Sequence, residues 1–364
     1  MKKKIIKWWS PRIGEEEFRL VKDVLASNYL NDGDITRQFE TKIASLLKVR
    51  QVIAVTSGTV ALSLSLKSLG VGCGDEVIVP DITFIATANA AEMCGAKVIL
   101  VDIDQKTSNI DVAAIKRAIT KKTKAIVPVH VTGRGADMGA ILKIAKENNI
   151  FVVEDAAEAL FSKQDDKYLG TLGDTGCFSL SPNKTITTGQ GGFIATDNDK
   201  LAVRLRELKD QGRPKTGTGG DDFHNSIGYN FKFTNLQAAV GLGQLNYLSE
   251  RTERMKKINR LYFDNLKNIE GLKLFEFKEE EIPQWTDAVI DRRDELEAYL
   301  KNRDINCRKY WFPLHTQLPY KLKDDNFANS TKLSPKALWL PSCFDLSDDE
   351  VMYVVNTIKE FYTI

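Results

Sequence analysis

The sequence predicts an α/β fold, with a large domain built on a mostly parallel sheet between layers of helices and a smaller C-terminal α+β domain. Between residues 52 and 196, short apolar runs rich in β-branched residues alternate with helical segments, which is typical of βα units. A chain of 364 residues also has room for about two domains. A long helical pattern over 235–266 then leads into mixed strands and helices. We therefore expect a large domain over 1–245 and a small domain over 246–364.

The elements of the large domain follow from local patterns. Apolar residues at helical spacing predict helices over 15–25 and 34–47, ahead of the first strand. The apolar runs that predict strands are VIAV (52–55), EVIVP (76–80), KVILV (97–101), KAIVPV (124–129), FVVED (151–155), CFSL (177–180) and GFIAT (192–196). The intervening segments that predict helices are 59–69, 111–120 and 137–147. Because ligands bind beyond the carboxyl ends of such strands, we expect functional residues just after each run.

The remaining elements complete the expected order. Residues 198–211 have a helical pattern, and 213–224 form a polar, glycine-rich loop. In the C-terminal part, the strands are expected over 272–277 and 286–291, and the helices over 293–302 and 347–361. This mixture predicts the α+β layer of the small domain.

Composition and charge exclude several classes of protein. The 51 Lys and Arg residues nearly balance the 49 Asp and Glu residues, so no basic excess indicates nucleic-acid binding. The five cysteines include no CxxC pair and the chain has three histidines, which argues against a metal site and against hydrolytic zinc chemistry. The first residues, MKKKIIKWWSPRIGEEE, contain no apolar stretch of signal-peptide length and no small-residue cleavage site, and no other window approaches 18 apolar residues. We expect a cytoplasmic protein with reduced cysteines and no membrane partner.

The first candidate site follows the run 52–55. Ser57, Gly58 and Thr59 lead directly into a predicted helix. Free N–H groups at a helix start, a glycine that lets the backbone approach an anion, and hydroxyl donors are typical of a phosphate site. The same residues also fit an ordinary Ser/Thr helix cap, and this segment alone does not separate the two interpretations.

Two further candidate sites hold ionisable side chains at strand ends. Asp155 and Glu158 follow the run 151–153, where a desolvated carboxylate needs a cationic or N–H partner; alternatively, Asp155 caps the next helix. Lys184 lies between a hydroxyl-rich strand end and the glycine-rich turn 189–192. A desolvated lysine amine can lose its proton and attack a carbonyl, although most lysines are surface charges.

Taken together, these sites indicate pyridoxal phosphate (PLP) as cofactor. PLP needs a lysine for its Schiff base, a carboxylate that keeps its pyridine nitrogen protonated, and a helix start or hydroxyl cluster for its phosphate. Lys184, Asp155 and the segment 57–59 supply all three in one predicted domain. A nicotinamide-dependent enzyme is disfavoured because no Gly-x-Gly-x-x-Gly follows the first strand.

The chain resembles the DegT/DnrJ-type sugar aminotransferases, a family of fold-type I PLP enzymes, from about Arg12 to its C-terminus. The matching segments, in the family's order, are SGTVAL, GDEVIVPDITFIATANA, PVHVTG, VVEDAAEAL, FSLSPNKTITTGQGG, GYNFKFTNLQAAVGLGQL, RDELEAYL and CRKYWFPLHTQ. The resemblance implies a large domain with a mostly parallel sheet of the seven-stranded type between helices, and a homodimer whose subunits complete each other's active sites.

The resemblance also implies residue roles around the cofactor. Lys184 would form the Schiff base and shuttle the proton between cofactor and substrate carbon, while Asp155 would hold the pyridinium nitrogen. Phe84 would stack on the ring, with Ala157 on the opposite face; a core phenylalanine is the alternative for Phe84. The other residues expected at the cofactor are Ser57, Gly58, Thr59, Glu158, Ser179 and Asn183, together with Asn230 from the neighbouring subunit.

The substrate side of the site is less fixed by the resemblance. The residues expected to line it are His130, Arg308, Trp311 and His315. A structural histidine with all its hydrogen bonds made is the alternative for both histidines. Two features depart from the family: Gln190 replaces a usual glutamate, and 279–291 is shorter than the usual His- and Tyr-rich stretch. Both leave the cofactor residues intact.

The resulting expectation is an aminotransferase that moves an amino group from L-glutamate to a keto-sugar. The acceptor is expected to be a nucleotide-linked keto-deoxysugar used for amino sugars of surface polysaccharides or glycans. One alternative is the same chemistry on a smaller phosphorylated ketone or a keto-octulosonate. Another is a regulatory relative without turnover, which the presence of Lys184 and Asp155 disfavours. Lys184 also argues against a sugar dehydratase of the family, in which histidine replaces the lysine.

Overall fold

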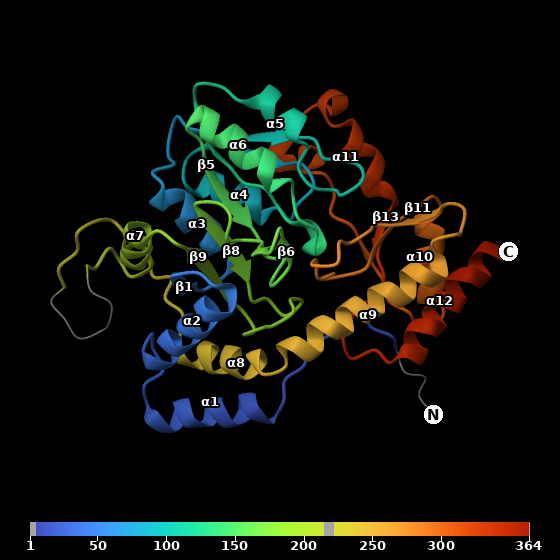
Figure 1. Ribbon diagram of the computed structural model, residues 1–364, viewed down its shortest axis with the longest axis horizontal. Helices are drawn as coiled ribbons and strands as arrows, with labels where there is room; N and C mark the ends of the chain where they lie inside the picture. Colours follow the sequence, from blue (N-terminus) through green and yellow to red (C-terminus); the bar gives the residue numbers. More distant parts are fainter. Residues whose placement is uncertain (1–4, 215–221, 364) are drawn as a thin grey trace.

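The structure is a computed structural model that describes residues 5–214 and 222–363. Figure 1 shows a large sheet with its helices in one half of the molecule and a smaller group of strands and helices in the other. Helix α9 (Leu248–Leu266) runs from the first half to the second. Among the described residues, the expected class is confirmed: a mixed α/β fold with one large, mostly parallel sheet and a smaller antiparallel one.

The large sheet contains every strand expected between residues 52 and 196. Its strands are β1 Gln51–Val55, β2 Glu76–Pro80, β3 Lys97–Val101, β4 Thr123–Ile126, β5 Phe151–Asp155, β8 Thr175–Ser179 and β9 Gly192–Thr196. Their order in the described part is β1-β9-β8-β5-β4-β2-β3. Only β9 runs against its neighbours, pairing antiparallel with β1 and β8. A short hairpin of β6 (Lys163–Gln164) and β7 (Lys167–Tyr168) was not expected.

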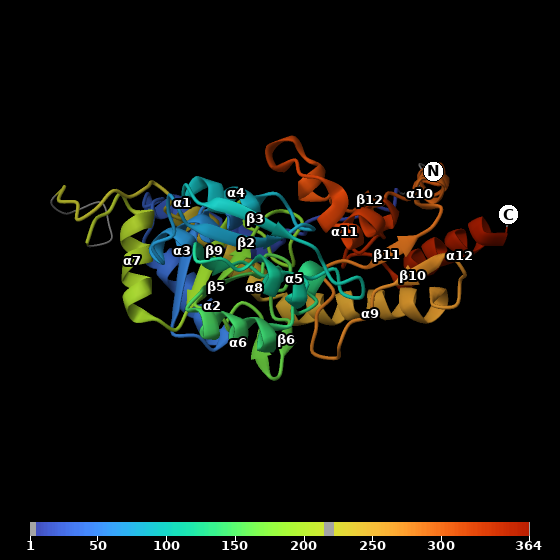
Figure 2. The ribbon, with the colours of Figure 1, turned by 90° about the horizontal axis from the view of Figure 1, so that it is seen from above.

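Helices cover both faces of the large sheet. One face carries α3 Gly58–Ser68, α4 Ala86–Met93 and α7 Asp199–Lys209; the other carries α2 Asp34–Leu47, α5 Val112–Ala118, α6 Met138–Asn148 and α8 Asn235–Leu245. Strand β2 shows why its sequence has no polar alternation: Val77 and Val79 pack with α3 and α4, while Ile78 packs with α5 and α6. A strand buried on both faces is a continuous apolar run. Figure 2 shows the two helical layers from above.

Two helix expectations differ from the structure. Helix α4 was not expected, because its alanine-rich sequence has no apolar stripe at helical spacing. The long helix expected over 235–266 is two helices, α8 and α9, separated at Asn246 and Tyr247. Asn246 keeps helical backbone angles, and Tyr247 departs from them with φ −101° and ψ 5°. A break this short does not disturb the apolar spacing from which the single helix was inferred.

The smaller sheet lies in the C-terminal part, with helices packed on it. Its antiparallel order in the described residues is β10-β11-β13-β12. The elements are β10 Leu272–Leu274, β11 Asp287–Ile290, α10 Arg293–Lys301, β12 Arg308–Lys309, α11 Ala328–Leu333, β13 Ala337–Trp339 and α12 Asp348–Thr363. Ile6, near the chain start, pairs with Ile305 and packs in the apolar core of this part. The boundary between 245 and 246 stays a prediction.

The N-terminal helix α1 (Glu15–Ser27) packs along α8 at the edge of the molecule, as Figure 1 shows. The buried Gln244 side chain of α8 donates to the carbonyl oxygen of Arg12 and hydrogen-bonds the Glu17 carboxylate. Short 3-10 turns connect other elements at Val131–Gly133, Leu314–Thr316, Leu318–Tyr320, Asp324–Asn326 and Ser334–Lys336.

A buried ion pair joins the two halves. Arg134 follows the turn after β4, and its guanidinium donates both terminal N–H groups to Asp287 of β11 at 2.7 Å each. Asp287 also accepts hydrogen bonds from the Thr132 and Tyr310 hydroxyls. The face of the Phe275 ring lies 4.4 Å from the guanidinium carbon. Because both charges are removed from water, each charge is stabilised by the other, and loss of one leaves the other buried without a partner.

We expect Arg134→Met to lower the free energy of unfolding by about 3–5 kcal/mol, because it leaves the Asp287 carboxylate buried without its cation. Urea unfolding of the apoprotein, followed by circular dichroism, measures the loss. The double variant Arg134→Met/Asp287→Asn removes both charges and should lose clearly less than the sum of the single variants. Simple additivity of the two losses would contradict this account.

Candidate active site

A cavity of about 330 Å³ opens at the carboxyl ends of the large sheet's strands. Its wall includes the ends of β1, β2, β5 and β8 and residues of the C-terminal part. The lining residues are Ser57, Gly58, Thr59, Leu62, Thr83, Phe84, Ala86, Val129, Asp155, Ala157, Glu158, Ser179, Ser181, Asn183, Lys184, Gln190, Trp285, Arg308 and Trp311. The structure thus brings the three separately predicted sites to one place.

One corner of the cavity collects hydroxyls and a helix start. Ser57 caps α3, since its hydroxyl accepts the Val60 N–H at 3.2 Å, so the helix-cap interpretation is also true. A Cβ on Gly58 would lie 3.1 Å from the Ser179 Cβ, which is tighter than most Cβ contacts. On the neighbouring strand, a Cβ on Gly192 would lie 2.6 Å from the Ser57 carbonyl carbon. These two glycines bring the start of α3 against the ends of β8 and β9.

Asp155 ends β5 at the centre of the cavity wall. Its carboxylate accepts the Thr87 hydroxyl at 2.7 Å and the Ala157 N–H at 3.1 Å. Burial raises the pKa of the Asp155 carboxyl above its ordinary value, and the Thr87 and Ala157 hydrogen bonds offset part of this increase. A positive group placed beside this carboxylate would favour its ionised form.

Lys184 projects into the same cavity and is paired with Glu158. Its Nζ donates to Glu158 Oε1 at 3.1 Å and lies 4.8 Å from the centre of the Trp285 ring. The second carboxylate oxygen of Glu158 accepts the Thr132 N–H at 3.1 Å. Burial raises the pKa of the Glu158 carboxyl, and the charge of Lys184 offsets part of that effect.

Several other expected residues also line the cavity. Phe84 is 55% exposed at the rim, so it is not a core phenylalanine in this chain. Ala157 and Asn183 lie in the wall, and Arg308 and Trp311 enter from the C-terminal part. The Arg308 guanidinium stacks 4.9 Å above the Trp8 ring.

His130 does not reach this cavity, so its expected substrate contact is wrong. The side chain is fully buried, with Nε2 2.9 Å from Glu154 Oε2 and Nδ1 accepting the Ala136 N–H at 3.2 Å. The Glu154 carboxylate also accepts the Gly170 N–H at 2.8 Å. His130 therefore has the structural role that was its alternative.

His315 is likewise buried, and the expectation that it lines the substrate site is wrong. Its Nδ1 lies 2.6 Å from Asp81 Oδ2, and its ring stacks on Phe327 with centroids 4.4 Å apart. Burial raises the pKa of the Asp81 carboxyl, although hydrogen bonds from Ser330 and His315 oppose this. The histidine holds the loop after β2 against the C-terminal part.

Asn230 lies away from the cavity of its own chain. It is exposed and pairs through its backbone with Asp210. Its expected contact in a neighbouring subunit stays a prediction. Of the loop expected over 213–224, residues 215–221 lie outside the described part of the structure.

Comparison with known proteins shows the family to which this chain belongs. The chain matches the DegT/DnrJ/EryC1/StrS aminotransferase family over residues 11–359. It belongs to this family. A GDP-perosamine synthase of Escherichia coli O157:H7 is 37% identical over 365 aligned residues, which cover 99% of each chain.

Solved structures agree with this family membership. A DegT DnrJ EryC1 StrS aminotransferase from Brucella abortus shares 30% identity and a TM-score of 0.89, with 96% of each chain covered. The PLP form of a sugar aminotransferase from Streptococcus pneumoniae shares 25% identity and a TM-score of 0.92, with 99% of each chain covered. The protein is a PLP-dependent aminotransferase.

The residues of this aminotransferase fit PLP. The α3 start, narrowed by Gly58 and flanked by the Ser179 and Ser181 hydroxyls, offers the N–H and O–H donors that a phosphate needs. Asp155 presents a buried carboxylate for a cationic ring nitrogen, and Lys184 presents the amine for an aldehyde. The cavity therefore contains a partner for each polar end of the cofactor.

Three important residues of the aminotransferase site were not expected from the sequence. Trp285 faces the Lys184 amine, Thr132 holds Glu158, and Thr87 holds Asp155. Trp285 lies within 279–291, the segment that is expected to be shorter than in the family. That difference in length was the one sequence feature that could have indicated a different residue in the cavity wall. Thr87 and Thr132 carried no local signal, since their partners are distant in sequence.

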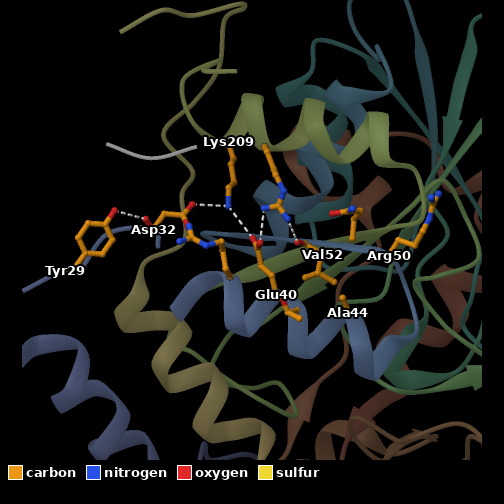
Figure 3. Close-up of a pocket in the computed structure, with 11 residues that line it drawn as sticks. Tyr29, Asp32, Glu40, Ala44, Arg50, Val52 and Lys209 are labelled. Atoms are coloured by element: carbon orange, nitrogen blue, oxygen red, sulfur yellow. Dashed lines mark hydrogen bonds and ion pairs between the residues drawn. The ribbon is translucent and has the colours of Figure 1, made fainter. Parts of the chain in front are cut away.

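A second cavity, of about 410 Å³, lies between α2, α7 and the start of β1, as Figure 3 shows. Lys209 is buried at its base, where Nζ lies 3.1 Å from Asp32 Oδ2 and 3.4 Å from Glu40 Oε1. Arg206 donates to the other Glu40 oxygen at 2.8 Å. These charges neutralise one another, so the cavity wall is an ion-pair network that fastens α2 to α7.

Among the described residues, no helix is long and apolar enough to cross a membrane. No cluster of three or more His, Cys, Asp or Glu side chains there is arranged to hold a metal ion.

Proposed function

We propose that this aminotransferase moves an amino group from L-glutamate to the keto group of a nucleotide-linked deoxysugar, for amino sugars of surface polysaccharides or glycans. The observation that carries the proposal is the cavity in which Lys184 and Asp155 lie beside an open rim with Arg308 and Trp311. The name of the Escherichia coli relative, a GDP-perosamine synthase, supports a nucleotide-linked amino sugar as product.

The cofactor end of the cavity assigns roles to this chain's residues. When bound, PLP supplies an electron sink that lets the amino group leave one carbon and join another. Asp155 would keep the ring nitrogen protonated, since a buried carboxylate favours a cation beside it. Ser57, Gly58, Thr59 and Ser179 would bind the phosphate. Lys184 would hold the cofactor and would move the proton at the reacting carbon.

The remaining wall orients the ring. Phe84 and Ala157 would pack on the ring of a bound cofactor, while Asn183 lines the wall together with Lys184. Phe84 follows the end of β2 and Ala157 follows the end of β5, and both line the cavity that contains Asp155. A ring held between two apolar side chains would leave its polar groups free to meet Asp155, Lys184 and the phosphate corner.

The substrate end of the cavity fits a nucleotide-linked sugar. Arg308 lies at the rim with a guanidinium that can donate bidentate hydrogen bonds to a diphosphate. Trp311 offers a flat apolar surface for a sugar or base ring. These groups are separate from the phosphate corner at α3, so cofactor and substrate phosphates have distinct partners.

The active enzyme is proposed to be a homodimer in which Asn230 reaches the neighbouring subunit's cofactor phosphate. Large apolar side chains are exposed on the surface, among them Phe84 at 55% on the cavity rim and Ile227 at 88%, three residues before Asn230. Such surface favours a protein partner, and a second copy would cover it. Light scattering checks this proposal, because a mass equal to one 40.8 kDa chain would contradict it.

Absorption spectroscopy of the PLP-loaded, desalted protein tests the proposed donor and acceptor. We expect the visible band of the lysine-bound cofactor to bleach with L-glutamate as 2-oxoglutarate forms. A nucleotide-linked 4-keto-deoxyhexose should then restore the band. Another amino acid that bleaches the band when glutamate does not would replace the donor, and restoration only by non-nucleotide ketones would overturn the acceptor.

A second acceptor class is favoured by one observation. Trp285, on the shortened segment 279–291, places a large ring next to Lys184 and narrows the reacting end of the cavity. A smaller phosphorylated ketone or a keto-octulosonate would then be the acceptor. Both compounds belong in the same spectroscopic panel, and preference for either over the nucleotide sugar would establish it.

A further inference from the structure

The pairing of Lys184 with Glu158 raises a question of proton transfer. An amine attacks an aldehyde through its lone pair, so the Lys184 ammonium must lose a proton before it can bind PLP. In the structure its Nζ donates to Glu158 Oε1 at 3.1 Å, and both side chains are nearly buried, with 11% and 7% of their surfaces exposed. The proton has an acceptor at hydrogen-bond distance and little access to water.

The orientation of Glu158 is fixed from behind. Its Oε2 accepts the Thr132 N–H at 3.1 Å, so its Oε1 remains directed at Lys184. Thr132 has a left-handed backbone with φ 51°, which is unfavourable for a β-branched residue. The Thr132 hydroxyl donates to Asp287 at 3.2 Å, and its carbonyl oxygen accepts the Gln284 N–H at 2.9 Å. Contacts from the C-terminal part therefore hold Thr132 in its strained conformation, and Thr132 in turn orients the Glu158 carboxylate.

We propose that Glu158 is a catalytic residue that accepts the proton of the Lys184 ammonium and so makes the lysine nucleophilic. The Nζ–H bond breaks, its electron pair stays on nitrogen, and the proton forms a new bond to Glu158 Oε1. The pair keeps its single proton and its net charge of zero. When Lys184 later needs a proton, the same carboxyl group returns it.

The surroundings favour this exchange. In a buried site an ion pair and a neutral pair differ less in free energy than in water, because the charged forms lose hydration. Burial also raises the pKa of the Glu158 carboxyl.

Other charged groups lie near the pair. Asp155 shares the cavity and is hydrogen-bonded by Thr87 and Ala157. Arg308 lines the same cavity from the C-terminal part. Behind Thr132, Arg134 and Asp287 form their own ion pair, and the Tyr310 hydroxyl donates to that Asp287. These groups are present in all the variants compared below. The pKa of the Glu158 carboxyl is raised by burial and, to a smaller extent, by the charge of Asp155.

Glu158→Gln tests the proposal, because glutamine keeps the size of the side chain and one acceptor oxygen but cannot take the proton. The rate of PLP loading onto the apoprotein is followed at the visible band between pH 6 and pH 9. A pair that shares one proton keeps a constant fraction of neutral lysine, so wild-type loading should change little with pH. In Glu158→Gln the rate should rise about tenfold per pH unit, since only solvent can remove the proton.

Glu281→Gln is the matched control. Glu281 is also buried and bonded to backbone N–H groups, of Gly135 and Lys278, and it does not line the cavity. Its variant should keep the flat wild-type profile. Circular dichroism and the melting temperature of each apoprotein separate a folding defect from a change in proton transfer.

Two further measurements keep the test independent of the proposed substrate. Labelling of Lys184 in the apoprotein by acetic anhydride, read by mass spectrometry, should show the same two pH profiles without PLP. Formate should accelerate loading of Glu158→Ala in proportion to its concentration. Equal steep profiles in wild type and Glu158→Gln would overturn the proposal, and so would an absence of formate rescue in folded Glu158→Ala. The inference rests on PLP dependence, so none of these outcomes depends on the sugar acceptor or the glutamate donor.

Discussion

Lys184→Ala is expected to lower aminotransferase turnover by at least about 10³-fold. The substitution removes both the covalent anchor of PLP and the group that moves the proton at the reacting carbon, and a positioned acid–base group alone contributes about 10²–10⁴-fold. Turnover is measured as 2-oxoglutarate formation. Borohydride treatment followed by mass spectrometry should show cofactor mass on wild-type Lys184 and none on the variant.

Lys184→Arg is the control for a merely structural effect. Arginine keeps a cation beside Glu158 and Trp285 but stays protonated, so it cannot form the covalent link. It should fold with a melting temperature near that of the wild type and have no turnover. Turnover at the wild-type rate in either variant would show that Lys184 is not the PLP lysine.

Asp155→Asn is expected to lower turnover on the order of 10³-fold while leaving the fold intact. Asparagine can still hydrogen-bond Thr87 but carries no charge, so a bound pyridine nitrogen loses the partner that keeps it protonated. The electron sink is then weakened in the step in which the carbon loses its proton. Stopped-flow bleaching with L-glutamate measures that half-reaction, and bleaching at the wild-type rate would contradict the role of Asp155.

The same substitution has a predicted effect on the apoprotein. Burial raises the pKa of Asp155 in the folded state, so the folded chain binds this proton more tightly than the unfolded chain does. The contribution of Asp155 to the free energy of unfolding is fully present below its unfolded pKa of about 3.9 and is lost as pH rises through the folded pKa. Asparagine does not titrate.

The melting temperature of Asp155→Asn relative to wild type should therefore be higher at pH 7.5 than at pH 5. Thermal unfolding of the two apoproteins at both pH values measures the difference. A relative melting temperature that falls between pH 5 and pH 7.5 would mean that the Thr87 and Ala157 hydrogen bonds outweigh burial.

The main architecture could be predicted because its cause is local. Strands such as 76–80 are continuous apolar runs, because helices cover both of their faces. The carboxyl ends of parallel strands lie at the same edge of the sheet, where ligands bind. For the same reason Ser57, Asp155 and Lys184, each placed after a run, were expected together, and all three line one cavity. The chemistry of each residue then limited what the cavity could bind.

The rest of the site depends on contacts between distant segments. His130 and His315 follow strand ends as the true site residues do, but their side chains turn to Glu154 and Asp81. Position after a strand does not show which way a side chain points. Thr132 is missed for a related reason, because its strained backbone is held by partners more than a hundred residues away.

The bonded unit of Thr132, Arg134 and Asp287 has a consequence for recombining this enzyme with its relatives. Exchange of the C-terminal part is an obvious way to change acceptor specificity, since that part supplies Arg308 and Trp311 to the rim. Yet Asp287 belongs to the same segment. It accepts the Thr132 hydroxyl, and the Thr132 N–H in turn fixes the orientation of the Glu158 carboxylate. A chimaera whose donor segment lacks a carboxylate at position 287 would inherit a new substrate rim together with a misaligned lysine partner.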